Sequence, residues 1–181
     1  MVPEAPLEST DTGLVQAGPG WFVVSARESR WRSAEGRGSF TPFGDEAEFP
    51  QLGFNLFVLG PGDPMGMYHW EADQEDFFVL SGEALLIIEG EERHLQQWDF
   101  VHCPVGTKHV IVGAGNGPCA VLAIGAREHQ DGAGWGGYTV DEAALRRGAG
   151  STEATTDPRV AYAPVPQREA TRYREGWLPG A

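Results

Sequence analysis

Two histidines and two glutamates lie at spacings that suit a single metal site. His69 and Glu71 are two residues apart, so on a β-strand their side chains leave from the same face. Glu75 starts an apolar run, and His109 follows a Pro-x-Gly turn and starts a β-rich run. Imidazole and carboxylate ligands suit Fe, Mn or Zn better than Ca or Mg. We therefore predict one divalent transition metal bound by these four residues.

Two ligand sets fit this pattern, and they imply different chemistry. If all four residues bind, two carboxylates leave the site nearly neutral, which makes it a weaker Lewis acid and less attractive to anionic substrates. If only three bind, two histidines and one carboxylate leave open positions, as in non-haem iron oxygenases. The spare glutamate, Glu71 or Glu75, would then be a catalytic general base. Glu71 shares a strand face with His69, which favours Glu71 as a ligand.

These residues belong to a series of short predicted strands. The separators are turn sequences rich in the chain's 25 glycines and 13 prolines. Many short strands joined by tight turns predict an all-β sandwich or barrel. The predicted strands are 21–24, 53–59, 67–71, 76–80, 83–88, 92–95, 98–103, 109–112 and 119–124.

Strand alternation also predicts which apolar side chains line the site. The residues that share a face with the four ligands are Met67, Phe77, Val79 and Ile111. Such a pocket suits a small, partly apolar organic substrate, although the same side chains would also fill a barrel without a ligand. On the first barrel strand two alternatives stay open, Asn55 with Phe57 or Phe54 with Leu56.

Composition limits the classes of partner and the compartment. A chain of 181 residues, 41% hydrophobic, predicts one globular domain. The net charge of −13 argues against nucleic acid or an anionic membrane as a partner. Cys103 and Cys119 are expected to be free core thiols in a reducing compartment. No signal peptide or membrane-spanning stretch is visible, so we expect a cytoplasmic protein.

The two ends are expected to differ from the barrel. Residues 1–20 are predicted to be a flexible arm, 21–128 the barrel, and 129–181 an extension that packs on the barrel or on a partner subunit. The extension has one helix signal, a capping box with Thr139 at the N-cap and Glu142 at N3.

Two further groups of residues are assigned outside the metal site. Four apolar side chains are candidates for a homodimer surface, with packing inside one chain as the alternative: Phe78, Leu80, Tyr173 and Trp177. Three histidines have no metal-ligand partners in the sequence and are not expected to bind the metal: His94, His102 and His129. For His102, which alternates with Val101 and Cys103, a surface position and a lining position both stay open.

The pattern over residues 52–125 resembles the cupin superfamily. Its first motif is matched by His69, Glu71, Glu75 and Gly82, and its second by Pro104, Gly106 and His109. The resemblance implies an RmlC-like double-stranded β-helix, or jelly-roll barrel, with a metal in its mouth, and often a dimer. The sequence departs from the family pattern at three positions: Glu71 replaces the second histidine, Trp98 replaces a glycine and Gly113 replaces an asparagine.

Three functions are compatible with these residues. The favoured one is a metal-dependent enzyme acting on a small organic molecule, with oxygenase-type chemistry. The second is a non-redox isomerase, epimerase or lyase in which Glu71 or Glu75 moves protons. The third is a small-ligand-binding barrel without catalysis, because a fold does not fix a function.

Overall fold

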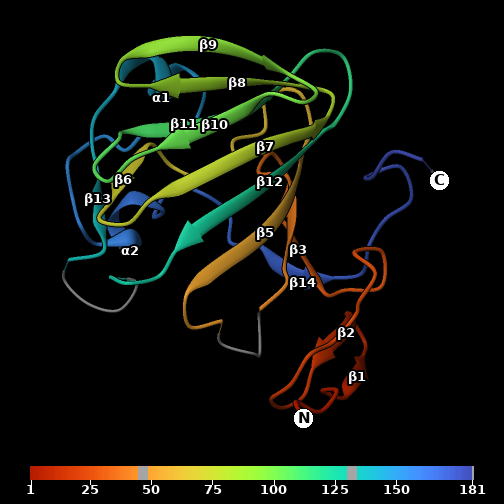
Figure 1. The fold of residues 1–181 in the computed structure, drawn as a ribbon. Coiled ribbons are helices and arrows are strands. Elements are labelled where there is room, and N and C mark those ends of the chain that lie inside the picture. The colour runs from red at the N-terminus through yellow and green to blue at the C-terminus, as the bar shows by residue number, and fades with distance from the viewer. Residues whose placement is uncertain (45–48, 130–133, 181) are drawn as a thin grey trace.

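Two antiparallel sheets face each other in the computed structural model, which describes residues 1–44, 49–129 and 134–180 (Figure 1). In order, the seven-stranded sheet contains β10 (Phe100–Cys103), β7 (Glu75–Ser81), β12 (Cys119–Ala126), β5 (Leu52–Leu59), β4 (Ser39–Pro42), β3 (Trp31–Ser33) and β14 (Glu169–Thr171). The five-stranded sheet contains β13 (Gly136–Tyr138), β6 (His69–Glu71), β11 (His109–Ala114), β8 (Glu83–Ile88) and β9 (Glu91–Gln96). The predicted all-β jelly-roll architecture is confirmed.

The main core lies between the two sheets. Along β7, Phe77 and Val79 are buried while the residues between and beside them are only half-buried, which is the period of two expected of a strand with one face inward. Cys103 and Cys119 are free and buried in this core, as predicted. Burial raises the pKa of the Cys119 thiol to about 11, so this side chain packs as a small apolar group.

The predicted strand at 21–24 is wrong, and four barrel-associated strands were not predicted. Trp21 makes one isolated bridge to Glu4, and Val23 is 78% exposed, so this apolar run has no sheet face to cover it. The strands β3, β4, β13 and β14 have three or four residues each, too few to show an alternating pattern in sequence.

Residues 7–16, expected to lie in a flexible arm, form a hairpin of β1 (Leu7–Thr10) and β2 (Gly13–Gln16). The Thr10 hydroxyl donates to the Gly13 carbonyl at 2.7 Å and closes the turn. Arg172 Nη2 donates to the Thr10 carbonyl at 3.1 Å and ties the hairpin to the other end of the chain. The hairpin projects away from the two sheets (Figure 1).

The described residues contain two short helices where one was predicted. The first, α1 (Glu142–Arg146), is capped by Asp141, whose Oδ1 accepts from Ala144 N at 2.9 Å. The predicted cap Thr139 is therefore wrong by two residues, because the carboxylate nearer the helix reaches its free N–H group. The second helix, α2 (Pro158–Ala161), begins with proline after Asp157, a start signal that the sequence contains but the prediction missed.

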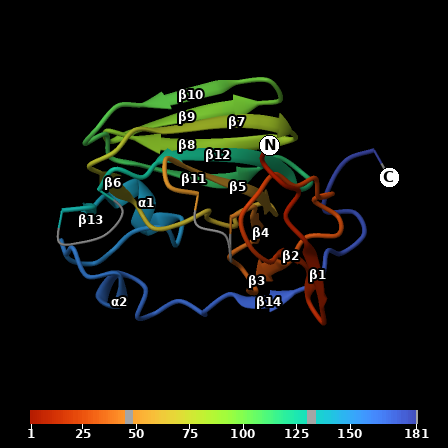
Figure 2. The same ribbon diagram turned by 60° about the horizontal axis from the view of Figure 1, so that its bottom comes forward.

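The C-terminal extension packs on the barrel of its own chain. Strand β14 pairs with β3, and the extension runs from α2 to β14 along the side away from β10 (Figure 2). Trp31 is fully buried, with ring centroids 6.0 Å from Tyr173 and 5.0 Å from Trp177. Leu80 packs against the same cluster. Of the four proposed dimer residues, these three are thus held within one chain, and the homodimer stays a prediction.

The fourth dimer candidate, Phe78, lies on the outer face of β7. Its ring centroid is 5.9 Å from that of Trp98, a 65% exposed residue in the turn before β10.

Among the described residues, no helix is long and apolar enough to cross a membrane.

Candidate metal centre

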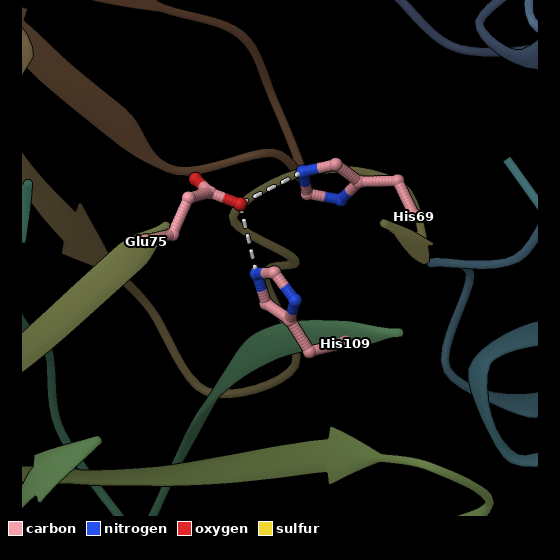
Figure 3. Close-up of side chains that lie close together, drawn as sticks. All are labelled: His69, Glu75 and His109. Atoms are coloured by element: carbon pink, nitrogen blue, oxygen red, sulfur yellow. Dashed lines mark ion pairs between the residues drawn. The ribbon is translucent and has the colours of Figure 1, made fainter. Parts of the chain in front are cut away.

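Three of the four predicted ligands come together between the sheets (Figure 3). His69 and His109 start β6 and β11 and face each other as directly paired residues of the five-stranded sheet. Glu75 starts β7 in the facing sheet. The site therefore depends on both sheets, and each ligand lies at a strand end, beside a loop that leaves room for a ligand.

The ligand atoms of these three residues all lie within 4.8 Å of one another. Glu75 Oε2 is 3.2 Å from His109 Nε2 and 3.5 Å from His69 Nε2. The imidazole ring centroids are 4.9 Å apart. Two nitrogens and one carboxylate oxygen thus converge on one point, as first-row transition metals require.

Both imidazoles are held in the tautomer that leaves Nε2 for a metal. His69 Nδ1 lies 2.8 Å from the Met67 carbonyl, and His109 Nδ1 lies 3.0 Å from the Thr107 carbonyl. Since a carbonyl oxygen only accepts, each Nδ1 carries the hydrogen and donates it. Metal-binding histidines show the same anchoring, which fixes ring orientation and increases the basicity of the ligand nitrogen.

Two of the converging atoms are buried without a hydrogen-bond partner. Among the described residues, neither Glu75 Oε2 nor His109 Nε2 makes a hydrogen bond of acceptable geometry, although the two atoms are close enough to attract each other electrostatically. Buried polar groups normally have a partner, and leaving one unpaired costs about 1–3 kcal/mol. A cation at the point of convergence would serve both atoms, so the residues present fit a metal.

The electrostatics favour positive charge at this point. Burial opposes protonation of His69, but Glu71 and Glu75 outweigh it and raise its pKa to about 10. Burial also opposes protonation of His109, but the Cys103 thiol and Glu75 raise its pKa to about 9. Burial opposes the charged form of Glu75, yet the two histidines lower its pKa to about 2. Without a metal, the site therefore holds protons in its place.

Glu71 lies at the edge of the centre. Its Oε1 is 3.5 Å from His69 Nε2, but Glu71 is not among the three residues whose ligand atoms all lie within 4.8 Å of each other. Its side chain is 28% exposed and lines a hollow together with Glu75, Arg127 and Trp135. This arrangement favours the three-ligand alternative, with Glu71 as the spare carboxylate.

A cavity of about 260 Å³ adjoins the three ligands. The predicted lining residues Phe77 and Ile111 contribute to it, and Asn55 and Phe57 do so from β5, which decides between the two alternatives for that strand. Apolar side chains dominate its wall, so the cavity suits a ligand with a carbon skeleton.

Two predicted lining residues lie elsewhere. Met67 precedes β6 in the structure, so strand alternation does not apply to it, and it packs against Tyr138 and Ala161. Val79 is fully buried in the main core between the sheets. Both are therefore core residues.

Several lining residues were not predicted from the sequence, and three of them come from outside residues 53–125. Phe40 comes from β4, and Tyr162 and Arg168 come from the C-terminal extension. No local pattern marks them, because they reach the cavity through tertiary packing. Arg168 lies about sixty residues or more from each metal ligand in sequence.

The other histidines lie outside this centre. His94 is exposed on β9, and His102 on the outer side of β10 pairs with Asp76 at 2.7 Å. His129 pairs with Asp73 at 2.7 Å, a partner that the sequence did not reveal.

The structure explains one of the two other departures from the family motifs, Gly113, and shows an unusual backbone at the other, Trp98. Trp98 adopts a left-handed backbone conformation with φ of 77°, which glycine adopts more easily. A Cβ on Gly113 would collide with the carbonyl oxygen of Gly60, so an asparagine does not fit there. Neither residue lines the cavity.

Comparisons with known proteins agree with this architecture. Residues 55–125 match the cupin domain family. A protein with a double-stranded β-helix domain from Klebsiella pneumoniae is similar with a TM-score of 0.51 and 21% identity, over 60% of this chain and 92% of that one. The polyketide cyclase RemF from Streptomyces resistomycificus is similar with a TM-score of 0.50 and 16% identity, over 59% and 79% of the two chains.

One further structure is more similar in sequence. A sugar phosphate isomerase of the cupin superfamily from Silicibacter pomeroyi is 27% identical with a TM-score of 0.45, over 56% of this chain and 62% of that one. This chain thus covers less than two thirds of that protein's length. A search of curated proteins finds no match.

The two motifs around the metal ligands, the pair of facing sheets and the family match lead to one assignment. The residues that match the family contain all three converging ligands and the strands that position them. Residues 55–125 of the chain thus form a cupin domain.

Proposed function

We propose that this cupin is a metal-dependent enzyme that acts on a small organic molecule, with oxygenase-type chemistry. The observation that carries the proposal is the convergence of His69 Nε2, His109 Nε2 and Glu75 Oε2, with both imidazoles anchored through Nδ1. Two histidines and one carboxylate form the ligand set associated with non-haem Fe(II) oxygenases. When bound, such a metal supplies Lewis acidity and open coordination positions for oxygen and substrate.

The chain's own residues would bind and shield the substrate. The apolar cavity wall, which includes Phe57 and Phe77, excludes water from the side of the ligands that faces the cavity. A drier site strengthens the electrostatic interactions inside it. Glu71, next to His69 but outside the group of three, is placed to accept a proton from a bound substrate.

A second function is favoured by the position of Glu71. A partly exposed carboxylate beside the metal centre, facing a second hollow, would also serve a non-redox isomerase, epimerase or lyase that moves a proton next to a polarised carbonyl. The two functions differ in their need for oxygen. Turnover without oxygen would favour the non-redox enzyme.

Metal content by elemental mass spectrometry tests the site. We expect near-stoichiometric metal in the wild type and in Glu71→Gln, and loss of metal in His109→Ala and Glu75→Gln. His94→Ala is the matched control, because it removes an exposed imidazole on β9. Iron or manganese would support oxygen chemistry, whereas zinc would favour the non-redox enzyme. A wild type that holds no metal even after reconstitution would refute the metalloenzyme.

A further inference from the structure

A half-buried arginine of the C-terminal extension, Arg168, lies in the wall of the metal-site cavity. Arg168 Nε donates to the Arg37 carbonyl at 3.2 Å, and Nη2 donates to the carbonyls of Arg37, Pro64 and Met65, the last at 3.0 Å. Within the described chain, none of these hydrogen bonds is made by Nη1. One edge of the guanidinium is thus fixed by the protein, and its Nη1 hydrogens are left for another acceptor.

This positive charge has no acidic partner among the described residues. The carbonyl groups satisfy hydrogen bonds, but they carry no net negative charge. Neighbouring Arg37 is 3% exposed and adds a second positive charge, with its own bonds going to the Gly148 carbonyl and Met67 Sδ. The carboxylate of Asp63 acts on both arginines at a distance, and its Oδ2 accepts a hydrogen bond from Gly60 N.

Arg168 remains charged at neutral pH despite this environment. Burial and the neighbouring charge of Arg37 lower the pKa of its guanidinium only to about 10. Buried charges are normally paired, because removing a charge from water is costly. Among the described residues, the half-buried Arg168 in the cavity wall and the buried Arg37 beside it have no carboxylate ion-pair partner, and an anionic ligand would supply the missing negative charge.

The surroundings also specify the rest of the ligand. The Arg168 guanidinium lies over the rings of Phe40 and Phe57, 5.4 and 6.0 Å from their centroids, and both rings line the cavity. The Tyr162 hydroxyl, in the same wall, accepts from Met67 N at 3.2 Å and interacts with the Tyr138 side chain, and as an O–H group it can also donate. The cavity thus offers two donors for an anionic group and aromatic faces for a carbon skeleton.

We propose that the substrate is a small organic acid whose carboxylate binds Arg168 Nη1 and the Tyr162 hydroxyl while its carbon skeleton fills the cavity beside the three metal ligands. This inference rests on the proposed function, but the anion site itself needs no metal. A metal held by two imidazoles and one carboxylate keeps a formal charge of about +1, so the metal centre would not repel the acid. A centre with both glutamates as ligands would attract anionic substrates less. That expectation does not hold for a centre in which Glu71 is not a ligand.

The test compares an acid with its neutral amide. Benzoate and benzamide are titrated into the full chain by calorimetry, once as purified and once loaded with zinc. A charge-assisted hydrogen bond contributes about 1.5–3 kcal/mol, so we expect the wild type to bind benzoate about 10-fold or more tighter than benzamide. Arg168→Met should abolish this preference and leave benzamide binding nearly unchanged.

The control variant Arg172→Met removes an equal charge from the same extension, outside the cavity, and should keep the preference. If Arg168→Met fails to fold, Arg168→Lys replaces it and should reduce the preference, because an ammonium cannot keep the carbonyl contacts and reach the ligand together. Equal binding of acid and amide by the wild type, an unchanged preference in the Arg168 variant, or no binding of either would overturn the proposal. Tighter binding of inorganic phosphate than of benzoate would overturn the carboxylate assignment.

The preference for benzoate over benzamide, measured in metal-free protein, tests the anion site independently of the proposed metalloenzyme. A chain that never holds metal but prefers benzoate through Arg168 would refute the enzyme and keep the anion site. A metal-loaded chain that prefers benzoate equally well in Arg168→Met would keep the metal centre and place the carboxylate on the metal.

Discussion

Binding of zinc at neutral pH should release nearly two protons from this protein. In the metal-free chain, burial alone would lower the pKa values of His69 and His109. The neighbouring Glu71 and Glu75 outweigh burial at His69 and raise its pKa to about 10. Cys103 and Glu75 do the same at His109 and raise its pKa to about 9. Both imidazoles are then protonated at pH 7.5. Zinc binds only neutral imidazole, so both protons must leave.

The magnitude follows from the same values. At pH 7.5 the pKa values of His69 and His109 lie about 2.5 and about 1.5 units above the solution pH. Since one pKa unit corresponds to about 1.4 kcal/mol, removing both protons costs about 5 kcal/mol. With two protons released, the apparent affinity for zinc should rise about 100-fold for each pH unit from about 6.5 to 8.5. Histidines with ordinary pKa values near 6.5 would give almost no dependence in the upper half of that range.

Calorimetric titration of zinc in buffers with different enthalpies of ionisation measures the number of protons directly. His94→Ala should not change that number, because His94 is exposed on β9. In metal-free Glu75→Gln, an NMR titration should show the pKa values of both site histidines lower than in the wild type. Release of fewer than one proton by the wild type would show that the imidazoles are already neutral, and would refute the electrostatic account of the centre.

Two further predictions concern the metal-free chain and its backbone. The lowered pKa of Glu75 stabilises the fold above about pH 4.5 and loses effect as pH falls towards 2, whereas the raised pKa values of the histidines stabilise it below pH 6.5 and lose effect as pH rises through 9–10. Melting curves should therefore show lower stability at pH 10 than at pH 6 in the metal-free wild type, with a smaller loss in Glu75→Gln; equal losses would contradict this. Gly113→Ala should cost about 1–3 kcal/mol in urea unfolding because its Cβ meets the Gly60 carbonyl, while the control Gly117→Ala, with open space around its Cβ, should stay within about 0.5 kcal/mol of wild type.

The parts of the site that lie close in sequence were predictable. The i, i+2 spacing of His69 and Glu71 placed both on one strand face, and the structure keeps them there with 3.5 Å between Nε2 and Oε1. What spacing did not decide is which glutamate meets both imidazoles. Glu75 does so because β7 belongs to the facing sheet, and the closeness of two sheets is a tertiary property that no local pattern carries.

The errors have the same origin at other positions. Met67 was assigned to the cavity by extending strand alternation two residues before β6 begins, where the chain is no longer a strand. The capping-box pattern predicts Thr139 as the helix cap, but Asp141, whose carboxylate oxygen can also accept a hydrogen bond, caps the helix. Local patterns identify the type of element reliably, but its end depends on which side chain the folded backbone presents to the free N–H groups.

The histidine tautomers, the charge of the centre and the anion site depend on residues at different distances along the chain. Each can therefore be changed by a separate mutation. The tautomer of each histidine is set locally, because His69 and His109 each donate to the carbonyl of the residue two positions earlier. The charge at the centre is set by Glu75 from the other sheet. The anion site is set by Arg168, far along the chain. A substitution at Arg168 should therefore change ligand preference without changing proton release on zinc binding, whereas Glu75→Gln should change proton release and leave the anion site in place.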